Sequence, residues 1–421
     1  MLFMDIKGLN ISMLNLTLVN SLRLQFALLC VLLASCDDHY DHGCYGCGNF
    51  TPTEFSNGVV GADFNGDGFA DVIALSTVQP TVSSTPSNIK AYLTTAAGAY
   101  ASPVSTADGF NPLYLASADL NADGLIDVVT ASFDDGALGV FFNNKNSPGS
   151  FNPAQVLSSP GASQVAIADM NGDGLPDIVS ADFNVSLFVQ TSPGTFAAPI
   201  SLYAGGANWI ALGDLNGDGA TDVALTDNVG VKVLMHTGAA SGTTFAAPLT
   251  VFTQSPNANV IGGNVIAIGD VDGDGLNDLV ITDPGPTGGM ATAVYVLLQD
   301  PANHGAFLAP ISYAIATQDR PQSIALRDLT GTGKLDIIIG GQKFVTVLLH
   351  DPANSFLAAS IYPAPGANEI AIADINGDGK LDIVVSNGVT FPMQGGVSTT
   401  HPGVLLQSTT TPETFGALQD L

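Results

Sequence analysis

Seven nine-residue segments of this chain carry oxygen-bearing side chains at the same positions. They read DFNGDGFAD (63–71), DLNADGLID (119–127), DMNGDGLPD (169–177), DLNGDGATD (214–222), DVDGDGLND (270–278), DLTGTGKLD (328–336) and DINGDGKLD (374–382). Hard oxygens from one short loop suit calcium, which takes about 6–8 oxygen ligands in flexible geometry. Magnesium fits less well, because it requires a strict octahedron. The segments therefore predict calcium sites.

The predicted ligands are the side chains at positions 1, 3, 5 and 9 of six segments, about six sites in all. A Gly at position 6 lets the chain turn sharply, and the carbonyl of position 7 can point inward. The ligand set is Asp63, Asn65, Asp67, Asp71, Asp119, Asn121, Asp123, Asp127, Asp169, Asn171, Asp173, Asp177, Asp214, Asn216, Asp218, Asp222, Asp270, Asp272, Asp274, Asp278, Asp374, Asn376, Asp378 and Asp382.

Two other interpretations of these segments are weaker. An EF-hand loop begins in the same way but needs a bidentate Glu at position 12. None of the residues at that position in the six segments is acidic: they are Ala74, Thr130, Ser180, Leu225, Ile281 and Val385. Polar hairpin turns also favour Asn-Gly and Asp-Gly, but such a turn does not require acids at positions 1, 5 and 9.

The sixth segment departs from the pattern and is predicted to bind no metal. Thr330 and Thr332 stand at positions 3 and 5, so only the acids at positions 1 and 9 remain. Arg327 precedes the segment and Lys334 lies within it. A fixed cation beside two carboxylates could take the place of the missing ion.

Apolar runs surround every segment and predict the elements that position it. The segments start 56, 50, 45, 56, 58 and 46 residues apart. One apolar run precedes each segment, a second follows it directly, and two more complete the repeat. Seven repeats of four short strands predict an all-β fold, a seven-bladed β-propeller with four-stranded blades and calcium-binding hairpin loops.

The first strand of each repeat carries a small residue three positions before the first Asp, where seven inner strands would crowd around an axis. These residues are Val60, Ala116, Ala166, Ala211, Ala267, Ala325 and Ala371. Residues 415–421 are expected to close the ring, with residues 50–52 as the alternative. The alternation of apolar residues around the small positions has the period of a strand.

These segments resemble the FG-GAP/VCBS repeats of seven-bladed propellers such as those of integrin α-subunits. The resemblance covers about residues 57–421. It implies that the Asp-rich hairpins bind calcium and that ligands bind on the opposite face. Function varies widely among such repeats, so the resemblance implies fold and metal better than role.

The start of the first strand, five residues before each first Asp, is the place where the repeats differ most. The seven residues there are Gly58, Tyr114, Gln164, Trp209, Val265, Ser323 and Glu369. Tyr114, Gln164, Trp209, Ser323 and Glu369 are the candidate ligand-binding residues. The two aromatic rings could stack on a sugar or grip a peptide, or they could fill the mouth of the channel.

Long connections between the second and third strands are a further candidate surface. They cover residues 76–88, 283–292 and 387–403. Blades one and seven are neighbours in a closed ring, so their connections should form a raised patch. The alternative is that these are tolerated surface insertions.

The sequence favours a binding or adhesion scaffold for a protein or glycan, and the alternative is a polysaccharide-active lyase or hydrolase. No nucleophile or metalloprotease motif is present, and no catalytic residue is predicted. His236 and His350 end the third strand where other repeats place Gln, which indicates a recurring polar position. Carboxylates outside the segments cannot be paired from sequence: Asp134, Asp135, Asp283 and Glu369.

The charge of the chain also bears on its partners. It has 38 acids and 10 bases, a formal net charge of −28, and the seven segments hold 21 of these acids. More than half of the acids therefore lie in the nine-residue segments. Nucleic-acid binding is not expected, because no basic stripe is present to meet phosphates.

The N-terminus predicts export and a lipid anchor. A short apolar run, LQFALLCVLLAS, precedes Cys36, and it is too short for a membrane span. Leu33–Cys36 resembles a bacterial lipobox, which implies that Cys36 is lipidated; an ordinary secretory signal is the alternative. We expect a signal peptide (1–35), a tether (36–56) and the propeller (57–421), attached to the cell envelope by the lipid alone.

The tether contains a small group of metal-donor residues. His39, His42, Cys44 and Cys47 could bind zinc, but the two pairs are too close for a folded loop between them. A Cys44–Cys47 disulfide, or a tether without either feature, is the other interpretation.

Overall fold

The computed structural model describes residues 54–78, 87–96, 99–110, 112–181, 183–237, 243–253, 265–283, 291–351, 355–386, 402–410 and 414–421. Within these ranges every regular element is a β-strand, and none is a helix that could cross a membrane. The predicted signal peptide, the lipidation site at Cys36 and the group His39, His42, Cys44 and Cys47 lie outside the described residues.

Seven antiparallel sheets of four strands follow one another along the chain. Blade one contains β1 (Glu54–Ala62), β2 (Asp71–Val78), β3 (Asn88–Tyr92) and β6 (Val104–Ala107). Blades two to four contain β7 (Tyr114–Ala118), β8 (Asp127–Ser132), β9 (Ala137–Phe141) and β10 (Gln155–Ser158); β11 (Gln164–Ala168), β12 (Asp177–Ala181), β13 (Val185–Phe188) and β16 (Ile200–Tyr203); and β17 (Trp209–Gly213), β18 (Asp222–Thr226), β19 (Gly230–Leu234) and β20 (Leu249–Thr253).

The remaining three blades have the same plan. They contain β21 (Ile266–Gly269), β22 (Asp278–Asp283), β23 (Ala291–Leu297) and β24 (Ile311–Asp319); β25 (Pro321–Arg327), β26 (Asp336–Gly341), β27 (Phe344–Leu348) and β30 (Ser360–Pro363); and β31 (Ile370–Ala373), β32 (Asp382–Val385), β33 (Gly403–Leu405) and β34 (Gln419–Asp420). Short hairpins add β4–β5 (Thr94–Ala96, Ala99–Tyr100), β14–β15 (Gln190–Ser192, Thr195–Phe196) and β28–β29 (His350–Asp351, Ser355–Phe356).

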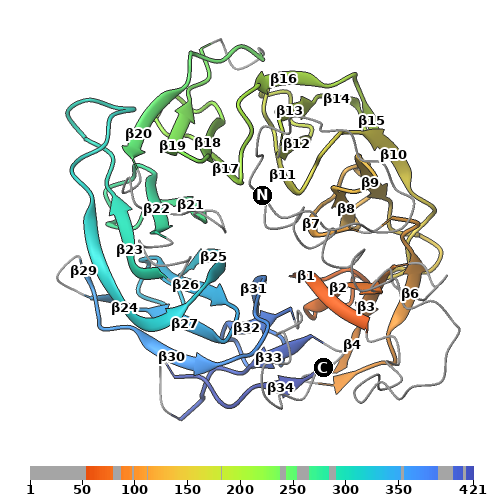
Figure 1. The fold of residues 1–421 in the computed structure, drawn as a ribbon. Helices are drawn as coiled ribbons and strands as arrows, with labels where there is room; N and C mark the ends of the chain where they lie inside the picture. Colours follow the sequence, from red (N-terminus) through yellow and green to blue (C-terminus); the bar gives the residue numbers. More distant parts are fainter. Residues whose placement is uncertain are drawn as a thin grey trace, which may run out of the picture. The chain divides into compact units, whose positions relative to one another are not determined.

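Within the propeller the first strand of each sheet lies innermost and the fourth lies at the rim (Figure 1). The predicted seven-bladed propeller is therefore confirmed. All seven small residues expected at the axis are half-buried, as side chains facing a narrow channel would be. Gly213 shows how closely the inner strands approach, because a Cβ there would lie 2.8 Å from Ile268 of the next blade.

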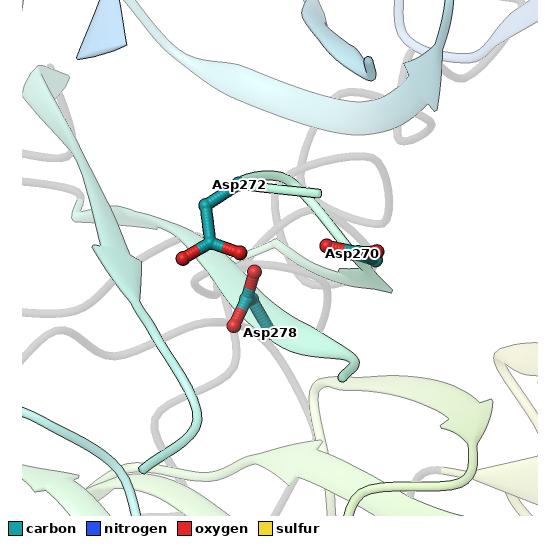
Figure 2. A group of neighbouring side chains, drawn as sticks. All are labelled: Asp270, Asp272 and Asp278. Atoms are coloured by element: carbon teal, nitrogen blue, oxygen red, sulfur yellow. The ribbon is translucent and has the colours of Figure 1, made fainter. Parts of the chain in front are cut away.

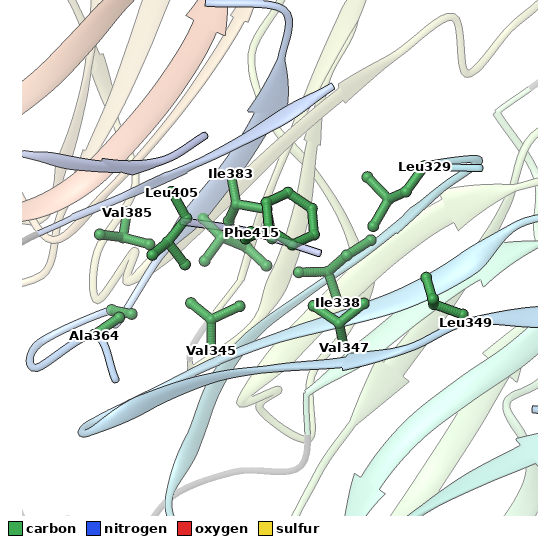
Figure 3. Packing of buried hydrophobic residues seen from close by; sticks show 12 residues of the cluster. Leu329, Ile338, Val345, Val347, Leu349, Ala364, Ile383, Val385, Leu405 and Phe415 are labelled. Atoms are coloured by element: carbon green, nitrogen blue, oxygen red, sulfur yellow. The ribbon is translucent and has the colours of Figure 1, made fainter. Parts of the chain in front are cut away.

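The core consists of apolar layers between neighbouring blades. Figure 3 shows one such layer, in which Ile338 and Val347 of blade six pack with Ile383, Leu405 and Phe415 of blade seven. All five are at most 8 % exposed. Each such side chain removed from water contributes roughly 1.5–3 kcal/mol, so these layers hold adjacent sheets face to face.

The C-terminus completes blade seven, because β34 pairs with β33. The ring closes by side-chain packing between blades one and seven, since every sheet is built from consecutive strands. Val59 and Tyr92 of blade one pack with Val384 and Leu421 of blade seven. The alternative closing segment, residues 50–52, lies outside the described residues, as do most of the long connections predicted to form a raised patch.

Candidate functional site

The Asp at position 9 of each segment ties its loop to the residue two positions beyond the third strand of its own blade. In blade one, Asp71 Oδ2 accepts the N–H of Phe64 at 3.0 Å, and Oδ1 accepts the N–H of Thr94 at 2.7 Å. The other six blades repeat both bonds, at 2.7–3.1 Å and 2.6–2.8 Å. Each carboxyl thus satisfies two backbone donors that burial would otherwise leave unpaired.

The donor beyond the third strand stands at the recurring polar position of the sequence. His236 and His350 occupy it in blades four and six, and their backbone N–H groups donate to Asp222 and Asp336 at 2.6 and 2.7 Å. The two histidines therefore occupy the same structural position as Gln190, Gln299 and Gln407 of other blades. A polar residue recurs at this position of the sequence. The carboxyl that accepts its N–H could not be identified from the sequence, because the pairing depends on the register of the strands.

The Asp at position 1 organises the turn from the other side. The N–H of the position 6 Gly donates to its Oδ2 at 2.6–2.9 Å in all seven segments. Gly68 has φ +90°, and a Cβ there would have nothing within 4 Å. The Gly is needed for its left-handed backbone and not for space.

The loop of blade five brings three carboxylates together (Figure 2). One oxygen from each of Asp270, Asp272 and Asp278 lies within 4.8 Å of the others. Two are half-buried and Asp278 is buried. Hard oxygens at this separation can share one cation of the size of calcium.

The position 9 carboxyls of the intact loops are difficult to ionise without a cation. Burial, only partly opposed by backbone hydrogen bonds, raises the pKa of Asp71, Asp127, Asp222 and Asp382 to about 6 and that of Asp278 to about 7. Neighbouring loop carboxylates contribute to this rise. A bound cation would reverse the effect by favouring the ionised form.

Blade six has the same loop backbone without carboxylates at positions 3 and 5. Asp328 accepts the N–H groups of Thr332 at 3.1 Å and Gly333 at 2.6 Å, and its Oδ1 also accepts the hydroxyl of Thr330 at 3.1 Å. Burial opposes ionisation of Asp328, but these bonds outweigh it and lower its pKa. The turn therefore forms without the two missing ligands.

Arg327 contacts the backbone beside its own loop, and Lys334 reaches toward the loop of blade five. Arg327 Nη1 donates to the Leu326 carbonyl at 2.9 Å. The Lys334 side chain approaches Gly273 in the loop of blade five. Burial raises the pKa of Asp272 in that loop, and the charge of Lys334 opposes this rise. The reason is that the blade six loop lies beside that of the preceding blade, a neighbour that the sequence does not specify.

Two of the predicted ligand-binding residues connect neighbouring blades. Gln164 Oε1 accepts the N–H of Ile210 at 2.5 Å, and Glu369 Oε2 accepts the N–H of Val59 at 3.1 Å. Each bond joins a residue at, or directly before, the start of one first strand to the first strand of the next blade. These two residues therefore have a structural role that the sequence pattern did not indicate.

The structure brings Tyr114 and Trp209 together, although one blade separates them. Their ring centroids are 5.4 Å apart at 88°, an edge-to-face contact. Both residues are half-buried. Ser323 is buried and its hydroxyl has no hydrogen-bond partner. The two rings thus contact each other, and part of the surface of each residue is exposed to solvent.

Buried acids that the sequence analysis did not single out also lie outside the loops. Asp227 pairs with Lys232 and accepts the Tyr203 hydroxyl at 3.0 Å. Asp108 is buried near Asp135.

Of the acids that the sequence analysis did name outside the segments, Asp134 is exposed. The Asp283 side chain lies outside the described residues.

The solved structures to which this chain is similar include proteins of several kinds. An Agrocybe aegerita lectin recognising non-reducing terminal N-acetylglucosamine is 21% identical, with a TM-score of 0.52, over 74% of this chain and 80% of that chain. The V. cholerae biofilm matrix protein Bap1 is 12% identical, with a TM-score of 0.41, over 82% and 86%. A Lactobacillus plantarum protein is 14% identical, with a TM-score of 0.48, over 76% and 88%.

No curated protein matches the sequence. The FG-GAP-like repeat matches six overlapping segments, at residues 63–130, 119–180, 169–225, 214–281, 270–339 and 328–385. Each segment runs from one nine-residue loop into the second strand of the next blade. Together they cover most of the propeller, so the chain belongs to the family of FG-GAP-like repeat proteins.

Proposed function

We propose that this protein is a calcium-stabilised, lipid-anchored propeller at the bacterial cell envelope, which binds a protein or glycan on the face opposite the nine-residue loops. The observation that carries the binding role is the half-buried pair Tyr114–Trp209. Aromatic side chains with part of the ring open are suited to stacking on a sugar or packing against a peptide.

Calcium in six loops is supported by comparison with blade six. That loop keeps the turn with Thr330 and Thr332 at positions 3 and 5. The backbone turn therefore forms without a carboxylate at position 5, so the carboxylates there in the other six loops have a role other than forming the turn. Binding a divalent cation is the use that suits them, because it also offsets the burial of the position 9 carboxyls.

A glycan is the partner class to test first. The fold that this chain shares with the Agrocybe aegerita lectin serves recognition of N-acetylglucosamine in that protein. Fold alone does not determine function, so the likeness only sets the order of testing. The lipid anchor rests on the sequence preceding Cys36, and it would place the propeller outside the cytoplasm.

The test is binding of the mature full-length protein to immobilised glycans in calcium buffer, with Trp209→Ala and the conservative Trp209→Phe. Removal of an aromatic anchor at a binding site typically weakens affinity about tenfold or more. We expect the Ala variant to lose binding and the Phe variant to retain most of it. Equal binding by wild type and the Ala variant, with both folded, would exclude this surface.

A further inference from the structure

A second group of oxygen ligands lies between blades one and two. Asp108 follows β6, Thr130 and Ser132 lie in β8, and Asp135 lies in the turn between β8 and β9. The nine-residue loops join first to second strands, whereas these segments join fourth to first and second to third. Because successive strands are antiparallel, the group lies at the opposite end of the blades.

The four side chains are linked to one another. Thr130 Oγ1 is 3.5 Å from Asp108 Oδ1, and the Ser132 hydroxyl donates to Asp135 Oδ2. Thr130 and Ser132 are two residues apart in one strand, so both point from the same face. Asp108 is 3 % exposed, and its Oδ2 has no hydrogen-bond partner.

Two other buried acids in the propeller have their charge compensated. Asp227 of blade four pairs with Lys232. Asp319, the last residue of the fourth strand β24, accepts the N–H groups of Arg320, Lys343 and Phe344 at 2.8–3.1 Å. Asp108 has no such compensation at Oδ2.

An ionised carboxyl in this position is unfavourable without a cation. Burial, followed by the charge of Asp135, raises the pKa of Asp108 to about 7, against the single opposing hydrogen bond from Thr130. Leaving a buried charge unpaired is strongly unfavourable, so the group must take up a proton or a cation.

We propose that Asp108 and Asp135, with the hydroxyls of Thr130 and Ser132, form a site for a divalent cation, separate from the nine-residue loops. All four donors are hard oxygens, which suit calcium or magnesium and not the softer transition metals. Asp135 is exposed and gives an ion access from solvent, whereas Asp108 closes the inner side.

The same two acids are not arranged for acid–base catalysis on a polysaccharide. A general acid must come within hydrogen-bond distance of the bond that it cleaves. With 3 % of its surface exposed, Asp108 cannot reach a glycosidic oxygen. Cation binding is therefore the use that fits the burial.

The test is calcium stoichiometry by equilibrium dialysis of the mature full-length protein, comparing wild type with Asp108→Asn, Asp135→Asn and Asp134→Asn. Asp134 is the exposed neighbour, so its variant makes the same charge change outside the site. We expect the first two variants to bind one ion fewer than wild type and the Asp134 variant to bind the same number.

A second readout guards against misfolding. Without metal, Asp108→Asn should unfold at a temperature equal to or above that of wild type, because it removes a buried charge beside Asp135. Its gain in unfolding temperature on adding calcium should be smaller than that of wild type. Unchanged stoichiometry in Asp108→Asn, or an equal loss in Asp134→Asn, would overturn the proposal whether or not the loops bind calcium.

Discussion

Glu369→Gln should remove a pH-dependent weakness at the junction where the ring closes. Glu369 Oε2 accepts the N–H of Val59 at 3.1 Å and lies beside Gly58, where the side chains of Leu75 and Leu115 also converge. Burial in these surroundings raises the pKa of Glu369 from 4.5 to about 8, and the single hydrogen bond only partly opposes this rise. A Gln can accept the same hydrogen bond, as Gln164 does in blade three.

The sign follows from the direction in which the pKa moves. Since the folded pKa is raised, the contribution of Glu369 to stability is fully present below about pH 4.5 and is lost as the pH rises through about 8. A pKa that differs by one between the folded and unfolded protein corresponds to about 1.4 kcal/mol. Allowing for the partial exposure of the residue, we expect Glu369→Gln to be more stable than wild type by roughly 2–4 kcal/mol at pH 9.

The assay is urea unfolding followed by circular dichroism at pH 5, 7 and 9, at constant calcium concentration. The two proteins should differ little at pH 5 and increasingly above it. The reciprocal variant Gln164→Glu is the matched control, because it places a carboxyl against the N–H of Ile210 and should acquire the same pH dependence. A stability difference between Glu369→Gln and wild type that does not change with pH would refute the reasoning.

Three further perturbations test other parts of the structure. Chelation should lower the unfolding temperature sharply, and calcium but not magnesium should restore it, because the loop carboxylates then repel one another; an unchanged melting curve after verified metal removal would contradict the calcium sites. Gly58→Ala should cost about 1–3 kcal/mol by overpacking, since its Cβ would lie 2.8 Å from Glu369 and 2.9 Å from Leu75; denaturant unfolding would measure the loss, and a stability equal to wild type would count against the close packing. The double change Thr330→Asn with Thr332→Asp should add one bound calcium per chain in equilibrium dialysis, because the blade six loop already has the required turn; unaltered stoichiometry would show that the turn and side chains do not suffice.

Much of the propeller follows from local pattern in the sequence. β7, β11 and β17 begin at Tyr114, Gln164 and Trp209, the predicted starts of the first strands. This agreement has a physical basis, since the strands are short and their alternation and turn residues are local properties. The loops are equally local, because the Asp at position 1 binds N–H groups within five residues of itself.

The contacts between distant segments could not be predicted from local sequence pattern. The second acceptor bond of each position 9 Asp reaches a residue 13–25 positions later, and its partner depends on the register of the third strand. Lys334 affects Asp272 of the preceding blade, and Glu369 reaches Val59 across the closure of the ring.

The sequence by itself determined the repeat, the four-stranded blades and the oxygen-rich loops, because periodic alternation and turn chemistry act over a few residues. Only the tertiary structure decided which residues meet at the boundaries between blades. It paired Tyr114 with Trp209 and left Asp108 buried near Asp135 without a partner for Oδ2. These contacts depend on how neighbouring sheets pack against one another, and the spacing of residues along the chain does not specify that packing.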